Sequence, residues 1–247
     1  MRLLTINLHC RQEVAWRENL RILADFIKDQ QVDVVLLQEC AQPLETLKLS
    51  SDNDVSLLQS HLKNQGLSFD VGWTLNHIGF QSFYEGLGVL SRFTIRKTEE
   101  VLISQSRDIT DWQTRKVQII TLDILGEILT LCNLHLGLEG NALSELKRFK
   151  NLVELKDLII AGDFNIPDSS HTYQEMKEIL NLSDVYKELV GSSDPTFFNG
   201  ADGWEGVEGQ RIDYVFGHRA TRVERVFLGT DAPRISDHAG LLVDFSF

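Results

Sequence analysis

Residues 158–165 have the sequence Leu-Ile-Ile-Ala-Gly-Asp-Phe-Asn, in which an apolar run ends in a carboxylate and a carboxamide. The apolar part, Leu158 to Ala161, predicts a short buried strand. The segment before it predicts an amphipathic helix, because its apolar positions recur every three or four residues: Leu143, Leu146, Phe149 and Val153. A further apolar run, 128–134, precedes that helix. The pattern therefore indicates a strand, a helix and a second strand.

The start of the chain repeats this pattern. Residues 2–8 form a short apolar segment, and residues 32–37 form a β-branched run typical of a buried strand. Between them, apolar residues recur at spacings of four, three and four: Trp16, Leu20, Leu23 and Ile27. One face of that helix is expected to pack on a core.

The remaining apolar runs predict a strand-rich protein with about two helices in each half. A helix is expected near 55–62, and strands are expected at 69–75, 86–90, 101–104, 117–125, 212–216, 223–228 and 241–245. No Pro-, Gly- or Ser-rich linker divides the chain, so we expect a single domain over residues 1–247. About a dozen strands in a chain of 247 residues suggest an α/β sandwich of two packed sheets covered by helices.

Most of the predicted strands end in polar residues. The segments at these ends are Ile6-Asn7, Leu37-Gln38-Glu39, Asn133-Leu134-His135, Gly162-Asp163-Phe164-Asn165, Ile212-Asp213 and Ser236-Asp237-His238. Such side chains resist burial unless they are paired or bind a metal ion, and stacked sheets can gather them at one rim. The set is rich in hard oxygen donors and lacks thiolates, which favours Mg²⁺, or Mn²⁺, over zinc.

A hard divalent cation beside an aspartate base indicates hydrolysis of a phosphate ester, because the metal neutralises phosphoryl oxygens and supports the leaving oxygen. An imidazole held charged by a carboxylate can donate to the phosphoryl group. Two such couples are expected from the residues, Asp213 with His238 and Glu85 with His135.

Seven motifs in chain order resemble those of the endonuclease/exonuclease/phosphatase superfamily. They are Thr-Ile-Asn7, Gln-Glu39, Glu85-Gly-Leu-Gly-Val-Leu-Ser, Asn-Leu-His135, Gly-Asp163-Phe-Asn165, Arg-Ile-Asp213-Tyr-Val-Phe and Ser-Asp237-His238. The resemblance covers the whole chain. It implies the deoxyribonuclease I-like fold, a four-layered α/β sandwich in which two mixed sheets pack face to face with helices outside.

The resemblance also implies a role for each motif residue, in a reaction in which an activated water attacks the phosphorus in line. Glu39 would be the principal magnesium ligand, with Asn7 and Asp237 close to the metal or its waters. Asp163 would be the general base, and Asn165 would bind a phosphoryl oxygen. His238, held by Asp213, would stabilise developing charge. His135, with Glu85 behind it, would contact another phosphate oxygen or assist the leaving group.

Each of these residues taken singly has a simpler explanation. Asp163, Asn165 and Pro167 are also typical of a turn that caps a helix, and His135 is also typical of a satisfied core imidazole. Because all seven motifs occur together and in the order found in the superfamily, we favour a shared site over these separate explanations. The sequence leaves open whether His9, two residues after Asn7, faces the same pocket.

Charge and cysteine content narrow the class of partner. Asp and Glu outnumber Lys and Arg by 36 to 24, for a formal charge of -12, which disfavours binding of long polyphosphate chains. The three cysteines have no metal-site spacing and are typical of reduced thiols, and the N-terminus lacks the features of a secretion signal. We therefore expect a cytoplasmic protein that neither crosses a membrane nor acts mainly on nucleic acid, and its oligomeric state stays open.

Three expected loops are rich in aromatic and hydrogen-bonding residues: 73–84, 108–115 and 197–208. Exposed indoles beside Asp, Asn and His suit the face and edge of a sugar ring, although loop anchors are an equally good explanation of the pattern. These loops resemble a bacterial branch that includes phosphatases of phosphorylated disaccharides, notably maltose 6'-phosphate. The resemblance implies a phosphomonoesterase that acts on a sugar phosphate. The substrate-binding residues would be Asn76, His77, Trp112, Arg115, Asp202 and Trp204, with Arg115 as a phosphate clamp.

An endonuclease, exonuclease or other phosphodiesterase of the same superfamily is the alternative. A nuclease needs a groove with spaced basic residues and stacking aromatics, and the densest basic segments here are only Arg92 to Lys97 and Arg219 to Arg225.

Overall fold

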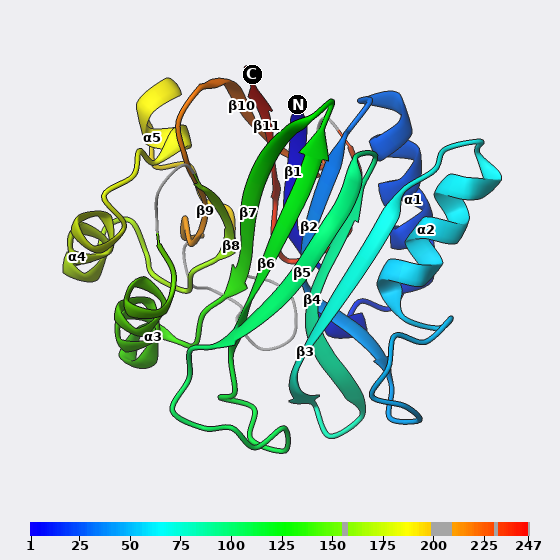
Figure 1. The fold of residues 1–247 in the computed structure, drawn as a ribbon, viewed down its shortest axis with the longest axis horizontal. Coiled ribbons are helices and arrows are strands. Elements are labelled where there is room, and N and C mark those ends of the chain that lie inside the picture. The colour runs from blue at the N-terminus through cyan, green and yellow to red at the C-terminus, as the bar shows by residue number, and fades with distance from the viewer. Residues whose placement is uncertain (155–157, 199–208, 230–231, 247) are drawn as a thin grey trace.

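The computed structural model describes residues 1–154, 158–198, 209–229 and 232–246. Its strands form two mixed sheets (Figure 1). The first has the order β10 (Ala220–Val226), β11 (Gly240–Phe245), β1 (Arg2–Asn7), β2 (Val34–Pro43), β4 (Phe83–Ser91) and β3 (Asp70–Gly79). The second has the order β5 (Thr94–Leu102), β6 (Lys116–Ile124), β7 (Glu127–His135), β8 (Leu158–Asp163) and β9 (Asp213–Phe216).

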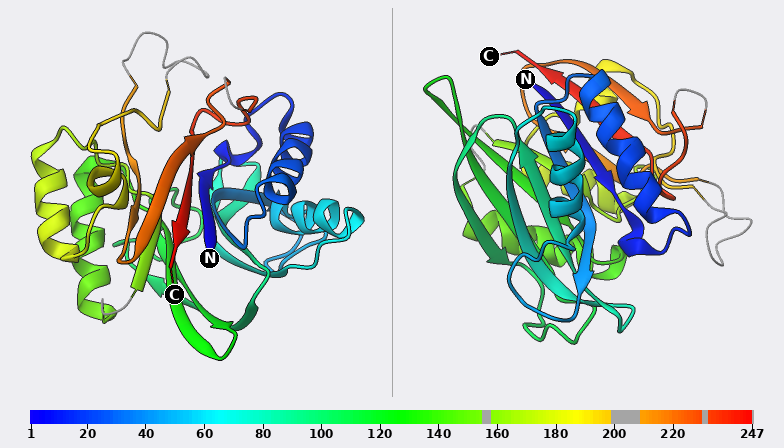
Figure 2. Two further views of the ribbon diagram at one scale, coloured as in Figure 1. Left: turned by 90° about the horizontal axis from the view of Figure 1, so that it is seen from above. Right: turned by 90° about the vertical axis from the view of Figure 1, so that its right-hand side faces the viewer.

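The two sheets pack face to face through alternate apolar side chains of their strands. Leu3, Val34 and Leu36 of the first sheet belong to one buried cluster with Ile120 and Leu131 of the second. Because successive side chains of a strand point to opposite faces, the other apolar positions face outward and need a second cover. Helices supply that cover on both sides, as Figure 2 shows.

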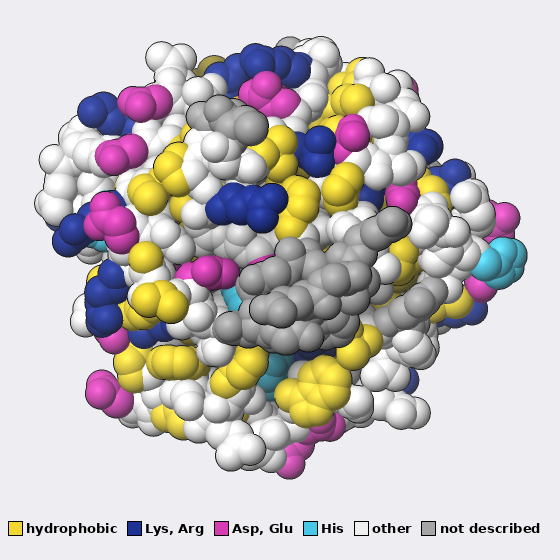
Figure 3. All heavy atoms as spheres, turned by 180° about the vertical axis from the view of Figure 1, so that it is seen from behind, with side chains coloured by type: hydrophobic (Ala, Val, Ile, Leu, Met, Phe, Trp, Pro, Cys, Tyr) yellow, Lys and Arg dark blue, Asp and Glu magenta, His cyan; other side chains and the backbone are white. Residues whose placement is uncertain are grey.

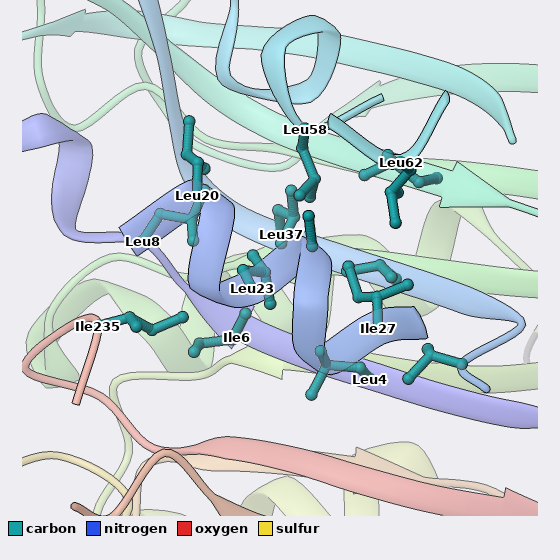
Figure 4. Packing of buried hydrophobic residues seen from close by; sticks show 14 of the residues in the cluster. Leu4, Ile6, Leu8, Leu20, Leu23, Ile27, Leu37, Leu58, Leu62 and Ile235 are labelled. Atoms are coloured by element: carbon teal, nitrogen blue, oxygen red, sulfur yellow. The ribbon is translucent and has the colours of Figure 1, made fainter. Parts of the chain in front are cut away.

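Helices α1 (Trp16–Asp29) and α2 (Asp54–Asn64) cover the first sheet. Figure 4 shows Leu23 and Ile27 of α1 close to Ile6 and Leu4 of β1, with which they share one buried cluster. Helices α3 (Glu139–Leu152) and α4 (His171–Leu180) cover the second sheet. The result is the predicted four-layered α/β sandwich. No helix among the described residues has both the length and the apolar character needed to cross a bilayer.

Several element bounds differ from the sequence-based prediction. The predicted loop 73–84 is the end of a β-hairpin, because β3 continues to Gly79 and β4 begins at Phe83. Strand β5 begins at Thr94, ahead of the apolar stretch that predicted it. Helix α4 and the short helix α5 (Val185–Leu189) lie where no helix was placed. Helix α4 packs on β8 and β9, and α5 packs on β9 and β10 but is too short for its apolar spacing to predict it.

The topology brings the polar ends of the strands to one edge. Strands β1 and β2 are parallel, as are β7 and β8, so their carboxyl ends lie together. Strand β9 runs antiparallel to β8 with Asp213 opposite Asp163. Asp213 therefore begins its strand instead of ending it, and His238 likewise lies just before β11. Carboxyl ends and amino ends both contribute to the edge, at the bottom of Figure 1.

A buried amide network joins the two sheets behind this edge. Gln38 Nε2 on β2 donates to Asn133 Oδ1 on β7 at 2.7 Å and to Thr5 Oγ1 at 3.0 Å. Asn133 Nδ2 in turn donates to the carbonyl oxygens of Leu37 and Gly88 at 3.1 and 3.0 Å. Hydrogen bonds between buried amides of this kind fix one relative position of two elements. The sheets therefore hold the residues beyond them in a defined register.

Candidate active site

A cavity of about 890 Å³ lies at the edge where the polar strand ends meet. Most of the predicted motif residues line it: Glu39, Glu85, His135, Asp163, Asn165, Asp237 and His238. Figure 3 shows hydrophobic, acidic and histidine side chains close together on the corresponding face of the molecule.

Asn7 links the two carboxylates on which the prediction of a single site depends. Its Nδ2 donates to Glu39 Oε1 at 2.9 Å and to Asp163 Oδ2 at 3.1 Å. Its Oδ1 accepts the backbone N–H of His9 at 2.9 Å. Residues from the two sheets thus meet around one carboxamide, and Asn7 positions Glu39 and Asp163 relative to each other.

A β-bulge directs Glu39 to this point. The register between β2 and β4 shifts between Leu37 and Cys40, and Glu39 has a φ of 50°. Left-handed backbone is rare for a residue with a β-carbon, and bulges of this kind re-aim side chains beside functional sites. Burial, with the nearby charge of Glu85, raises the pKa of Glu39 to about 8. A partly buried carboxylate beside other carboxylates favours a cation as its partner.

Asp163, His238 and Asp213 form a buried chain. His238 Nδ1 lies 2.9 Å from Asp213 Oδ2, and His238 Nε2 lies 3.8 Å from Asp163 Oδ2. Burial alone would lower the pKa of His238, but the charge of Asp213 and its hydrogen bond outweigh burial and raise that pKa to about 10. Burial and the charge of Asp213 raise the pKa of Asp163 to about 7. The expected Asp213–His238 pair is therefore present, with a carboxylate beyond it.

Asn165, two residues after Asp163, has a left-handed backbone with a φ of 51°. Its backbone N–H donates to Asp163 Oδ1 at 2.9 Å, and its Nδ2 donates to the carbonyl of Leu136 at 2.9 Å. The second hydrogen of the same amide is available to an oxygen in the cavity. Asn165 thereby orients Asp163 and presents a donor at the cavity wall.

The expected pairing of Glu85 with His135 is wrong. Glu85 lies opposite His77 across the β3–β4 hairpin, and its Oε1 is 3.3 Å from His77 Nε2. The bulge between Leu75 and His77 places His77 in that register, which local sequence does not reveal. Burial opposes ionisation of Glu85, but His77, Arg115 and His135 together lower its pKa to about 2.

His135 instead faces the Asp163 and Glu39 carboxylates. Its Nε2 is 3.7 Å from Asp163 Oδ2 and 3.9 Å from Glu39 Oε1. Burial, with the charge of Arg115, holds its pKa well below the usual range, so His135 is neutral at physiological pH. A neutral imidazole can bind a phosphate oxygen or a metal-bound water through one N–H.

The donor set fits a hard divalent cation. Glu39 and Asp237 offer carboxylate oxygens in the cavity, and Asn7 lies against Glu39. Burial raises the thiol pKa of Cys10, Cys40 and Cys132, so the described residues offer no thiolate for a soft metal. A second group of potential ligands, His9, Glu13 and Asp237, has its ligand atoms within 4.8 Å of one another at the edge of the same cavity.

The predicted substrate-binding residues divide into three groups. Trp112, Arg115 and His77 line the cavity. Asn76 does not: its Oδ1 accepts the backbone N–H of Lys116 at 3.0 Å, and it is buried within the hairpin, so its assignment to substrate is corrected. Asp202 and Trp204 lie outside the described residues.

Sequence reasoning also missed residues of the cavity. Phe80, Leu138 and Phe197 line it, and so does His9, whose position the sequence left open. Phe80 follows Gly79 at the hairpin turn, where Phe80 and Gln81 both have positive φ. The neighbouring Gly and Ser signalled the turn, but only the pairing of β3 with β4 shows which side chain faces the cavity.

Comparisons with known proteins agree with this arrangement. The model of the Endonuclease/Exonuclease/phosphatase family matches residues 4–238. A solved family protein from Leptotrichia buccalis is 23% identical with a TM-score of 0.89, and the match covers 100% of each chain. A mannosyl-6-phosphatase from Bacteroides thetaiotaomicron is 17% identical with a TM-score of 0.69, again over 100% of each chain. The human Nocturnin catalytic domain is 20% identical with a TM-score of 0.69, over 100% of this chain and 93% of that one. No curated protein matches the chain.

Proposed function

Because the chain belongs to the endonuclease/exonuclease/phosphatase family, whose members are metal-dependent hydrolases of phosphoesters, we propose that it is a magnesium-dependent phosphomonoesterase that acts on a sugar phosphate. The observation that carries the proposal is that Asp163, His238 and Glu39 line one cavity, with Asp213 paired to His238 behind it. This arrangement joins a base, a charged donor and a cation ligand at a single point.

Asp163 acts as the general base. Its raised pKa of about 7 places it close to neutral pH, where proton transfer from water is most efficient. Asn165 N–H and Asn7 Nδ2 each hold one of its oxygens, so the carboxylate is oriented before the substrate arrives. Attack by the oriented water on phosphorus breaks the bond to the sugar oxygen and releases inorganic phosphate and the free sugar.

His238 and Asn165 stabilise the charge that develops on the phosphoryl oxygens. His238 stays protonated because Asp213 holds it, and its Nε2 is on the Asp163 side of the ring. Glu39, with Asp237 and Asn7 nearby, would hold Mg²⁺, which when bound supplies further neutralisation of the phosphoryl group. Arg115 serves as the phosphate clamp, and neutral His135 donates to another phosphate oxygen or to the leaving group.

The lining of the cavity favours a small substrate over nucleic acid. Arg115 is the single Lys or Arg among the described residues that line it, whereas a groove for a polyanion needs several. The formal charge of -12 acts in the same direction. The structural likeness to a mannosyl-6-phosphatase supports a sugar phosphate. A cytoplasmic location belongs to the same proposal, which the unpaired thiols of Cys10, Cys40 and Cys132 support.

A substrate panel tests the proposal. Purified protein is assayed with Mg²⁺ and with EDTA on hexose and disaccharide phosphates, on bis(p-nitrophenyl) phosphate, and on plasmid and abasic DNA. Release of inorganic phosphate from the sugar phosphates alone, and only with metal, supports it. The Asp163→Asn variant, purified in parallel, controls for a contaminating phosphatase. Nicked DNA, or cleavage of the bis-ester alone, would support the nuclease alternative.

The dependence of activity on pH tests the role of Asp213. In the wild type, His238 must be protonated, so activity persists on the alkaline side until pH passes the His238 pKa of about 10. Asp213→Asn removes the charge and the hydrogen bond that raise this pKa most, and burial then lowers the pKa toward the ordinary histidine value of 6.5. Activity of the variant should therefore fall with rising pH already in the neutral range, with a loss of up to about 30-fold at pH 8. If kcat of the wild type and of the Asp213→Asn variant falls at the same alkaline pH, Asp213 does not keep His238 protonated.

A further inference from the structure

We propose that Phe80 and Trp112 form a binding wall for the sugar ring of the substrate, and that this wall determines which phosphomonoester the enzyme accepts. The inference rests on the proposed function, because it says which residues contact the sugar that is released when the bond between phosphorus and the sugar oxygen breaks. We call Phe80 and Trp112 the aromatic wall. They come from two segments, the β3–β4 turn and the loop 105–115 before β6.

Both rings of the aromatic wall are exposed to solvent yet belong to the lining of the catalytic cavity. Phe80 is 58% exposed and Trp112 is 52% exposed. Each side chain therefore leaves about half of its surface uncovered by the rest of the protein, and aromatic rings provide flat apolar area at little cost in side-chain entropy. A ligand that covers these rings would bury apolar surface that stays exposed to water in the folded protein, and this burial would favour binding.

Contacts with backbone carbonyls join the β3–β4 hairpin to the loop 105–115. Ile78 N–H donates to the carbonyl of Ile109 at 2.6 Å, and His77 Nδ1 lies 3.2 Å from the carbonyl of Thr114. The positive φ of Phe80 and Gln81 sets a tight turn between β3 and β4. The aromatic wall is therefore pre-organised by backbone contacts.

Arg115 connects the aromatic wall to the catalytic end of the cavity. Arg115 is 5% exposed, and its Nη1 donates to the carbonyl of Trp112 at 2.5 Å. Its Nε has no hydrogen-bond partner among the described residues, which leaves an unsatisfied buried donor beside the cavity. The residue proposed to hold the phosphate thus also fixes Trp112. The protein therefore sets the distance between the bound phosphate and the Trp112 ring. A fixed distance of this kind allows the enzyme to distinguish phosphomonoesters by the alcohol that they carry.

The polar residues beside the aromatic wall suit a hydroxylated ring. Gln81 and Thr110, next to Phe80 and close to Trp112 in sequence, line the same cavity, as does Gln210. A hexose places its C–H face on an aromatic plane and its hydroxyl groups at the edge, where amides and hydroxyls can pair with them. A lipid chain would leave these polar groups unpaired, which costs binding free energy. A nucleobase can also stack, and the test separates it from a sugar.

The test compares two monoesters that share the phosphate but differ in the ring. For each protein, kcat/KM is measured with the hexose phosphate that the wild type hydrolyses fastest and with glycerol phosphate, which has no ring. We expect Phe80→Ala and Trp112→Ala each to lower the ratio of the two kcat/KM values by about tenfold, mainly through KM for the hexose phosphate. Phe80→Tyr and Trp112→Phe, which keep a ring, should restore the ratio.

Leu125→Ala is the matched control, because Leu125 is 98% exposed at the turn between β6 and β7, at the other end of the sheet. It should leave the ratio unchanged. An unchanged ratio in both alanine variants would overturn the aromatic wall while leaving the proposed function intact. A wild type that prefers nucleoside monophosphates, with that preference lost in the variants, would overturn the sugar as occupant. A wild type that releases phosphate from no monoester would overturn the proposed function itself.

Discussion

Asp163→Asn is expected to lower kcat by about 10³-fold while the protein remains folded. The carboxylate is the one group of the site that is held by two donors and that lies beside His238, so it is placed to take the proton of the attacking water. Asparagine keeps an oxygen for the N–H of Asn165 but has no basic site. Turnover is measured as phosphate release from the best substrate under saturating conditions.

The same variant should be at least as stable as the wild type at pH 8 in EDTA. The folded-state pKa of Asp163, about 7, lies above the ordinary value of 3.8, so its contribution to stability is present below pH 3.8 and is lost as pH rises through 7. At pH 8 the ionised carboxylate therefore opposes folding, and the neutral amide removes that cost. A variant with wild-type turnover would refute the role of Asp163, and a variant that does not fold would refute the stability argument.

Glu39→Gln is expected to abolish both the activity and the stabilisation of the protein by Mg²⁺. A cation that binds only the folded state raises the melting temperature, and the shift depends on its concentration and affinity. Glu39 is the partly buried carboxylate that the bulge in β2 directs into the cavity, and its raised pKa of about 8 reflects desolvation and the neighbouring charges of Glu85 and Asp237. The variant should lose the Mg²⁺-dependent shift, and kcat should fall by about 10³-fold.

Glu13→Gln is the matched control for this prediction. Glu13 Oε1 lies 3.1 Å from His9 Nδ1 in the second group of potential ligands, at the edge of the same cavity. The Glu13 variant should keep the Mg²⁺-dependent shift in melting temperature. Loss of the shift in the Glu13 variant, together with its survival in the Glu39 variant, would place the cation in the second group.

The sequence predicted the parts of the fold that depend on local pattern. The strand–helix–strand units around α1 and α3 follow from apolar spacing. The polar residues that follow apolar runs predicted that Asp163, Glu39 and His238 belong to the site. Helix α4 also had a readable signal, since Ser170 caps its first turn and Tyr173, Met176 and Leu180 are spaced for one buried face. Helix α5, with five residues, is too short for such a pattern.

The parts of the site that were not predicted depend on strand register. Glu85 pairs with His77, and not with His135, because of a bulge whose position is set by pairing between β3 and β4. Asn76, in the same bulge, is turned to Lys116 and away from the cavity. A shift of one residue changes which face a side chain occupies, and no local pattern encodes that shift. The sequence therefore predicted which residues line the cavity more reliably than it predicted their hydrogen-bond and ion-pair partners.

The central claim is that residues from both sheets converge to hold one hard cation at Glu39, beside the base Asp163. A crystal grown with Mn²⁺ in place of Mg²⁺ tests it most directly, because the anomalous signal of manganese locates the ion without reference to activity. The account predicts a peak within about 2.5 Å of a Glu39 carboxylate oxygen, in the cavity that Asp163 and His238 line. A peak confined to His9 and Glu13, with none at Glu39, would contradict it.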